Sequence, residues 1–171
     1  ISEMRLGLQA AELSQEQRVL AMRYVIDRFA EKGKFDSKDG DIAAIFTQMM
    51  DETQRRLGDI TRKVGEGAFE IAYQPICDLK DGKVSHYEAL ARFDNPEGTG
   101  ETVKFIEALG ISNAFDLMVA NKVMGVIEDR SDVHIAFNIS GATIASPASF
   151  GLLAGMLAKR RKLAPRDRKS T

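Results

Sequence analysis

Hydrophobic residues recur at helical spacing through the first 64 positions of the chain. Ser14 followed by Gln17 forms a capping-box pattern, which predicts the start of a helix. The apolar positions that follow, at spacings of one to three residues, are Met22, Val25, Ile26 and Phe29. The polar stretch 31–41 is expected to end this helix, and a second helix is predicted to begin near Asp41.

The second helix carries a short heptad stripe. From Met50 onward the spacing alternates between three and four residues, at Met50, Thr53, Leu57, Ile60 and Val64. Such a stripe can pack in a helical hairpin of the same chain, or it can belong to a signalling helix that pairs with its copy in a dimer. We prefer the hairpin as the role of this stripe. We expect the segment as a whole to pack against the rest of the chain or to form much of a homodimer contact. The acidic loop at 36–41 does not predict a calcium site, because Lys38 and Gly40 occupy positions that would need oxygen ligands.

After residue 68 the pattern changes to the alternation of strands. Residues 69–94 form two strand-like runs around Lys80, Asp81 and Gly82, which is a strong hairpin signal. With these three residues as the loop and Gly82 in the left-handed conformation, Gln74 lies opposite Glu88 on one face. A loop of two residues would place them on opposite faces.

The remainder of the chain continues with helices and one more strand. Residues 104–128 are predicted to be mostly helical, 133–140 to be a strand, and 149–162 to be a helix. A strand, a long helix, a strand and another helix make a β/α succession with parallel crossovers. The fold class is therefore α/β, preceded by an α-helical segment.

Each predicted strand has one face that can pack and one that carries polar groups. The apolar positions are Tyr87, Ala89, Ala91 and Phe93 in one strand, and Val133, Ile135, Phe137 and Ile139 in another. We expect helices to cover this side. The opposite side gathers Gln74, Glu88, Arg92 and Asn138. Because charges on an interior surface need partners or a metal, this gathering favours a functional site over a solvated edge.

Composition excludes several classes of function. Lys and Arg number 24 against 25 for Asp and Glu, so the net charge of -1 recruits neither a nucleic-acid polymer nor an anionic membrane. A single cysteine, Cys77, excludes an internal disulfide framework and fits a reducing compartment, so we expect a cytoplasmic protein. His86 and His134 are the only histidines, and packing or hydrogen bonding is preferred to a metal site for both. The first residue is Ile1, which suggests a segment of a longer polypeptide.

Three motifs together resemble one known family. They are YQPICDL, HYEALARF with the tripeptide Glu88-Ala89-Leu90, and FNIS. Gln74 stands 14 positions ahead of Glu88, and the Asn-x-Ser strand follows Glu88 by 50. This extended pattern is similar to that of the EAL-domain family, bacterial phosphodiesterases that cleave cyclic di-GMP. The resemblance covers about residues 66–171, so we expect a helical linker or signalling segment at 1–64 and the N-terminal part of an EAL domain at 65–171.

The resemblance implies a fold and a chemistry. The fold would be a partial (β/α)8 TIM-type barrel whose first strand is antiparallel to the rest. By the family's motif, Glu88 and Asn138 would be metal ligands for Mg²⁺ or Mn²⁺, Arg92 would hold a phosphate, and Leu90 and Gln74 would contact the nucleotide. Two metals would activate a water for an in-line displacement that gives linear pGpG.

The chain departs from the family pattern in its second half. A barrel of this type takes about 250 residues, and the later metal-binding residues and any general base are absent from the sequence, so the catalytic base is unassigned. The first expected function is a cyclic di-GMP phosphodiesterase in the complete protein. The alternative is a non-catalytic, degenerate EAL module that binds cyclic di-GMP or a protein partner. The 171-residue chain by itself is expected not to hydrolyse cyclic di-GMP.

Overall fold

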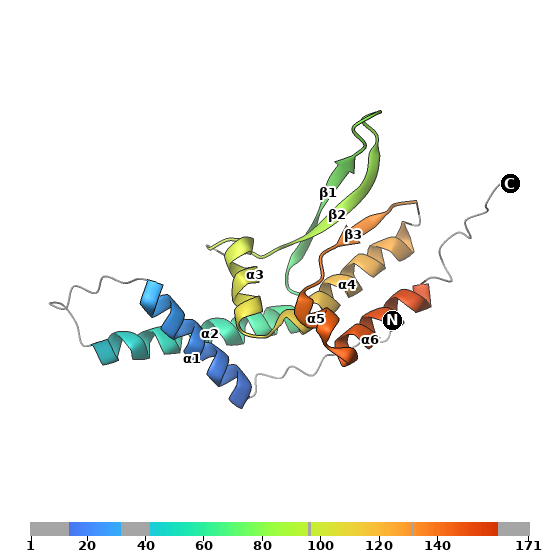
Figure 1. Cartoon of the computed structure of the whole chain (residues 1–171). Helices are drawn as coiled ribbons and strands as arrows, with labels where there is room; N and C mark the ends of the chain where they lie inside the picture. The colour runs from blue at the N-terminus through green and yellow to red at the C-terminus, as the bar shows by residue number, and fades with distance from the viewer. Residues whose placement is uncertain (1–13, 32–41, 96, 131, 161–171) are drawn as a thin grey trace. The chain divides into compact units, whose positions relative to one another are not determined.

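The computed structural model describes residues 14–31, 42–95, 97–130 and 132–160. The elements in these ranges, labelled in Figure 1, are α1 (Gln15–Glu31), α2 (Ile42–Glu66), β1 (Glu70–Cys77), β2 (Val84–Arg92), α3 (Thr99–Ala108), α4 (Ser112–Asp129), β3 (Ile135–Phe137), α5 (Gly141–Ala145) and α6 (Pro147–Arg160). They form two compact units. The helical unit lies within residues 1–68 and 100–111, and the sheet unit within 69–99 and 112–171. The chain is therefore a mixed α/β protein, as predicted.

The helical unit begins with the predicted capping box. The backbone N–H of Gln17 donates to Ser14 Oγ at 3.1 Å, and the backbone N–H of Ser14 donates to Gln17 Oε1 at 3.1 Å. These two bonds satisfy backbone donors that the first turn of α1 leaves without helical partners. Helix α1 is described through Glu31, and α2 from Ile42. The acidic loop at 36–41 lies outside the described residues.

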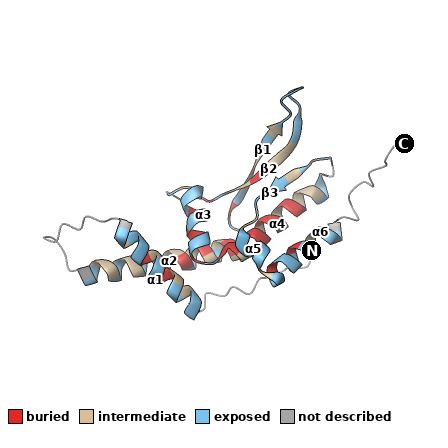
Figure 2. Ribbon diagram, in the orientation of Figure 1, coloured by how far each residue is buried: buried red, intermediate tan, exposed pale blue. Residues whose placement is uncertain are grey.

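From Thr53 onward, the heptad stripe of α2 is buried within the chain itself, and Met50 is half-buried. Thr53, Leu57, Ile60 and Val64 are all buried, and they contribute to the red segments of α2 in Figure 2. Helices α1 and α2 pack against each other, with the rings of Phe29 and Phe46 edge to face at 6.4 Å. This burial supports the interpretation of the stripe as packing in a helical hairpin.

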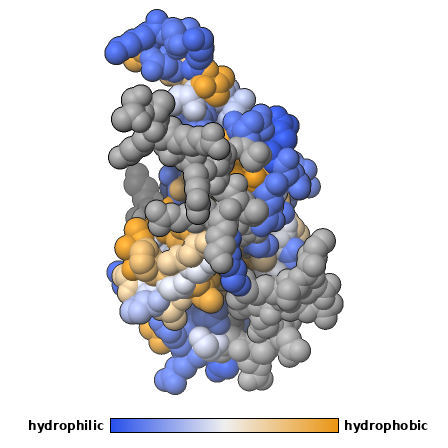
Figure 3. All heavy atoms as spheres, turned by 90° about the vertical axis from the view of Figure 1, so that its right-hand side faces the viewer, coloured by the Kyte–Doolittle hydropathy of each residue, from blue (hydrophilic) through white to orange (hydrophobic). Residues whose placement is uncertain are grey.

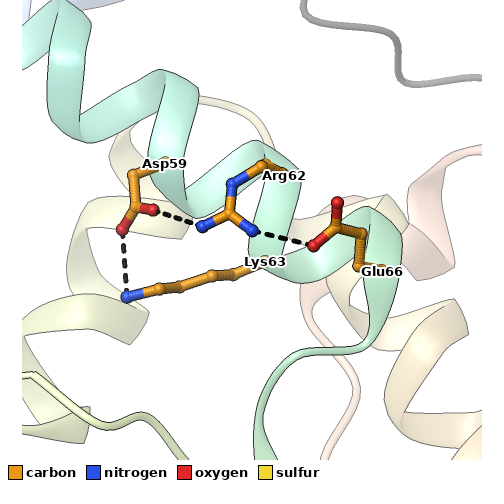
Figure 4. Close-up of polar contacts among 4 residues, drawn as sticks. All are labelled: Asp59, Arg62, Lys63 and Glu66. Atoms are coloured by element: carbon orange, nitrogen blue, oxygen red, sulfur yellow. Dashed lines mark hydrogen bonds and ion pairs between the residues drawn. The ribbon is translucent and has the colours of Figure 1, made fainter.

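The last turns of α2 carry a chain of ion pairs, drawn in Figure 4. Arg62 lies 2.9 Å from Asp59 and 2.8 Å from Glu66, and Lys63 lies 3.0 Å from Asp59. Burial acts to raise the pKa of the Asp59 carboxyl, but hydrogen bonds and charge from Lys63 and Arg62 together bring it below its ordinary value. These pairs join neighbouring turns of one helix, so they support the helix locally.

Helix α3 completes the helical unit around Phe105. This ring is buried and meets the Tyr24 ring edge to face at 5.1 Å, while the Arg56 guanidinium lies 4.1 Å from its centroid. The predicted helical run at 104–128 is interrupted between α3 and α4. Gly110 has a φ of 70°, a left-handed backbone conformation that would be strained in a residue with a side chain, and it follows the end of α3.

The sheet has the order β1-β2-β3, with β1 antiparallel and β3 parallel to β2. Gln74 pairs with Glu88 and Gly82 is left-handed, as predicted, but the predicted loop length was wrong. Asp78 and Lys83 close a loop of four residues, 79–82, in which Gly82 has a φ of 71°. Ser85 is then an extra residue between the pairs Cys77–Val84 and Ile76–His86, and this bulge restores the expected register.

Helix α4 covers the apolar face of the sheet, and α6 packs against α4 and adds Leu153 to the cluster beneath the sheet. Phe137 and Ile139 pack against a buried cluster of Leu117, Ala120 and Leu153. A second contact joins the rings of Phe69, Phe93 and Phe115, whose centroids lie 5.2 to 5.8 Å apart. The predicted division into a helix-covered and an open face is confirmed. Strand β3 is shorter than the predicted run of 133–140, because only residues 135–137 pair with β2.

Two short-range features at the end of the described chain were not predicted. Helix α5 was missed, and α6 begins at Pro147 where residue 149 was expected. The earlier start follows from Ser146, whose hydroxyl oxygen accepts from the Ser149 N–H at 3.3 Å. Several large apolar side chains of these two helices are exposed: Ile144, Phe150, Leu152 and Leu157. Orange, hydrophobic surface is visible among blue, hydrophilic surface in Figure 3.

Candidate functional site

The candidate site lies on the open face of the sheet, opposite the helices. Glu88 occupies the middle strand, β2, and pairs with Gln74 on β1 and with Ala136 on β3. Its neighbour Ala89 is buried on the covered face, so Glu88 points to the other side. Asn138 follows the last residue of β3 and is exposed, next to Phe137 on the covered face.

Glu88 and Asn138 are in direct contact although 50 residues separate them in the sequence. The Asn138 side-chain Nδ2 donates a hydrogen bond to Glu88 Oε1 at 2.9 Å. The contact depends on the parallel pairing of β3 with β2, which aligns Ala136 with Glu88. The prediction that these two residues share a face is confirmed.

The two side chains can be tested against the geometry of a divalent cation. In an octahedral site with ligands at about 2.1 Å, adjacent ligand oxygens lie about 3.0 Å apart. The observed separation between Glu88 Oε1 and the Asn138 amide is 2.9 Å. A half-turn of the amide would exchange its nitrogen for its oxygen at almost the same place. Carboxylate and amide oxygens are the ligands that Mg²⁺ and Mn²⁺ prefer, so the chemistry of the pair suits such an ion, while its 2.9 Å separation is that of an ordinary hydrogen bond.

The other predicted site residues lie on the same face without joining this contact. Gln74 is exposed in β1, directly across from Glu88. Leu90 and Arg92 lie two and four residues farther along β2, and Arg92 is thus about 13 Å from Glu88 along the strand. The Arg92 guanidinium donates to the backbone carbonyl of Ala91 at 2.8 Å. The open face therefore offers an acid-amide pair at one place and a cationic group at another.

Histidine and cysteine do not add to this pair. His86 lies within hydrogen-bond distance of Ser85, with Nδ1 and Oγ 3.3 Å apart, and His134 and Cys77 are exposed. Among the described residues no three His, Cys, Asp or Glu side chains gather as a metal site would require. Within the described part of the chain, Glu88 and Asn138 are thus the candidate ligands that the geometry brings together.

One residue beside the site was missed by sequence reasoning. Asp116 is a buried carboxylate of α4, and its Oδ2 accepts hydrogen bonds from the Ser140 N–H, the Ser140 hydroxyl and the Thr143 hydroxyl, at 2.8, 2.6 and 2.7 Å. Ser140 is also the N-cap residue of α5. The available signal was an acidic residue between Phe115 and Leu117, inside an apolar helix stripe.

Comparison with solved structures agrees with this architecture. The chain is similar to the EAL enzyme Bd1971 in its cGMP-bound form, with a TM-score of 0.55 and 18% identity, over 87% of this chain and 41% of that one. It is also similar to the form of Bd1971 with cAMP and cyclic di-GMP bound, with a TM-score of 0.52 and 18% identity, over 81% of this chain and 43% of that one. The chain thus spans less than half of the length of that protein. No curated protein matches the sequence.

The family itself is shown by its sequence profile. The profile of the EAL domain matches residues 57–167, which include both strands of the hairpin, Glu88 and Asn138. This is more than half of the chain. The protein therefore belongs to the EAL domain family.

Proposed function

We propose that this chain is the N-terminal part of a cyclic di-GMP phosphodiesterase domain, in which Glu88 and Asn138 hold a divalent metal ion. The observation that carries the proposal is the 2.9 Å contact between the Glu88 carboxylate and the Asn138 amide on the open face of the sheet. EAL domains generally are metal-dependent phosphodiesterases of this second messenger. A solved neighbour with the same fold has cyclic di-GMP bound.

Each proposed role follows from side-chain chemistry. Glu88 supplies a negative charge and Asn138 a neutral oxygen, a combination suited to Mg²⁺ or Mn²⁺. When bound, the ion would activate a water and stabilise charge on the phosphodiester oxygens. Arg92 provides a planar guanidinium that suits two phosphate oxygens, about 13 Å from Glu88 along β2. Gln74 and Leu90 supply polar and apolar contacts to the nucleotide on the same face.

The proposed fold of the complete domain extends the observed sheet. In the proposed fold, strands β1, β2 and β3 with α4 and α6 would form the opening of a (β/α)8 barrel with an antiparallel first strand; the antiparallel pairing of β1 with β2 and the parallel pairing of β2 with β3 support this. In that arrangement the open face of the sheet becomes the inner face of the barrel. No helix in the described ranges is both long and apolar enough to cross a membrane.

The second candidate is a module that binds cyclic di-GMP without cleaving it. It is favoured by the small number of candidate ligands in the described residues. The two candidates make different predictions for a polypeptide that carries a complete EAL domain including these residues. A phosphodiesterase converts cyclic di-GMP to pGpG in the presence of Mg²⁺ or Mn²⁺, whereas the module retains the cyclic dinucleotide unchanged.

After incubation of that polypeptide with cyclic di-GMP and the metal ion, anion-exchange chromatography separates the remaining cyclic di-GMP from pGpG. Loss of a metal ligand removes a few kcal/mol of stabilisation, so Glu88→Ala should lower turnover by about a hundredfold or more. Glu107→Ala is a matched control, because Glu107 is an exposed glutamate of α3, outside the sheet. Equal turnover in Glu88→Ala and in the unsubstituted protein would remove Glu88 from the site. Binding without conversion would establish the non-catalytic module.

A further inference from the structure

The segment that carries Asn138 has few regular backbone contacts of its own. Strand β3 ends at Phe137 and helix α5 begins at Gly141, so residues 138–140 belong to neither. The Asn138 side chain is exposed, and its amide contacts Glu88. Its position must therefore be determined by what holds the chain on either side of it.

On the N-terminal side, the pairing of β3 with β2 fixes the chain. Ala136 pairs with Glu88 and Phe137 with Ala89. The Phe137 ring packs into the cluster beneath the sheet. This anchor reaches the residue immediately before Asn138.

On the C-terminal side, Asp116 holds Ser140. The carboxylate accepts from both the backbone N–H and the hydroxyl of Ser140, and the Thr143 hydroxyl donates to the same oxygen. Asp116 is 5% exposed and Thr143 is 0% exposed, so water competes little for these bonds. The Ser140 oxygen in turn accepts from the Thr143 N–H at 3.2 Å. The anchor therefore joins α4, the end of the 138–140 segment and the first turn of α5.

We propose that Asp116 is a positioning residue, which holds Asn138 against Glu88 by fixing Ser140 two residues farther along the chain. Asp116 itself does not touch either member of the pair. The effect of Asp116 on metal affinity rests on the proposed function, in which Asn138 is a metal ligand and needs neighbouring groups to keep it in place. The effect of Asp116 on the position of the Asn138 amide does not rest on the proposed function, because the hydrogen bond from Asn138 to Glu88 exists without a metal.

The test uses the 171-residue chain and two measurements. The first is the NMR position of the two Nδ2 protons of Asn138 in metal-free protein, with Glu88→Ala as the reference for a lost contact. The second is the dissociation constant for Mn²⁺, from the electron paramagnetic resonance signal of the free ion. In Asp116→Asn we expect the amide signals to move toward their positions in Glu88→Ala, and the Mn²⁺ dissociation constant to rise about tenfold. Asp129→Asn is the matched control, since Asp129 is an exposed aspartate at the end of the same helix, and it should change neither.

A purely structural role predicts a different result. Asp116→Asn would then lower the urea midpoint while leaving the Asn138 amide signals and the Mn²⁺ dissociation constant at their original values, and this outcome would overturn the proposal. If Asp116→Asn does not fold by circular dichroism, Ser140→Ala decides, because it removes one hydroxyl donor and keeps the N–H bond. It should move the Asn138 signals in the same direction, and Ser140→Thr should restore them. Unmoved signals in a folded Ser140→Ala protein would equally overturn it.

A different result would refute the proposed function. If the unsubstituted chain and Glu88→Ala bind Mn²⁺ equally, Glu88 is no ligand in this chain, and the proposed metal site is wrong. The amide signals of metal-free protein still decide the role of Asp116.

Discussion

Phe137 and Asn138 are adjacent in the chain but should respond to substitution in opposite ways. Phe137 packs beneath the sheet against Leu117, Ala120 and Leu153, whereas Asn138 lies on the open face and contacts Glu88. We therefore compare Phe137→Ala with Asn138→Ala in the 171-residue chain. The first removes packing and the second removes one exposed hydrogen bond.

The expected magnitudes follow from burial. Truncating a fully buried phenylalanine to alanine costs about 3 to 5 kcal/mol, and because Phe137 is only partly buried we expect about 2 to 3 kcal/mol. The Asn138 amide makes an exposed hydrogen bond of 2.9 Å, which contributes about 1 kcal/mol or less. Metal affinity should show the reverse order, since Asn138→Ala removes a proposed ligand and Phe137→Ala does not.

Urea unfolding followed by circular dichroism measures the first quantity, and Mn²⁺ titration measures the second. Phe137→Ala should lower the unfolding midpoint and should weaken Mn²⁺ binding by the folded protein less than Asn138→Ala does, because the pairing of β3 with β2 still anchors Asn138. Asn138→Ala should do the opposite. If Asn138→Ala destabilises the protein as much as Phe137→Ala does, the division of β3 into a packed and a functional face is refuted.

Three further predictions concern other parts of the chain. Burial raises the pKa of the Tyr73 phenol above its ordinary value of about 10, so the stability that this shift contributes is complete below pH 10 and is lost as the pH rises through the raised pKa. Ionisation of tyrosine is followed by absorbance at 295 nm, and the part of the titration that Tyr73→Phe removes should be centred above pH 10. A centre at or below pH 10 would contradict the raised pKa. Arg62→Gln removes the ion pairs with Asp59 and Glu66 and should lower the unfolding temperature at low salt, but only slightly because these pairs are exposed. Salt screens exposed ion pairs, so a difference that persists in about 1 M salt would show that their loss is not the cause. The homodimer stays a prediction, and the exposed side chain of Met22 on α1 offers a place to test it. If α1 contributes to a dimer contact, Met22→Glu should reduce the molar mass measured by light scattering. A monomer in both proteins would count against the dimer.

The shared face of Glu88 and Asn138 could be predicted from sequence because strand alternation is a strict rule. Once Glu88 and Asn138 were assigned to polar faces, the parallel crossover required them to lie on the same side of the sheet. The hairpin shows how a correct pairing arose from a wrong detail. The loop has four residues where three were predicted, and the bulge at Ser85 compensates for the difference. A bulge of this kind depends on local hydrogen bonds that the hydrophobic pattern does not record.

What sequence reasoning missed are contacts between polar groups that lie far apart in the chain. Asp116 and Ser140 are 24 residues apart, and neither periodicity nor spacing relates them. Short elements were missed for a related reason. Helix α5 has five residues, too few for a periodic pattern, and its start is fixed by the Ser140 cap.

The location of a bound metal ion tests the proposed site on the open face of the sheet. Crystals of the chain grown with Mn²⁺ and measured at its absorption edge would give an anomalous difference peak at the ion. If Glu88 and Asn138 hold the ion, the peak lies about 2.1 Å from both a Glu88 carboxylate oxygen and the Asn138 amide oxygen, with the amide turned relative to its present contact. A Mn²⁺ peak elsewhere, with the Asn138 nitrogen still donating to Glu88, would contradict the proposed site.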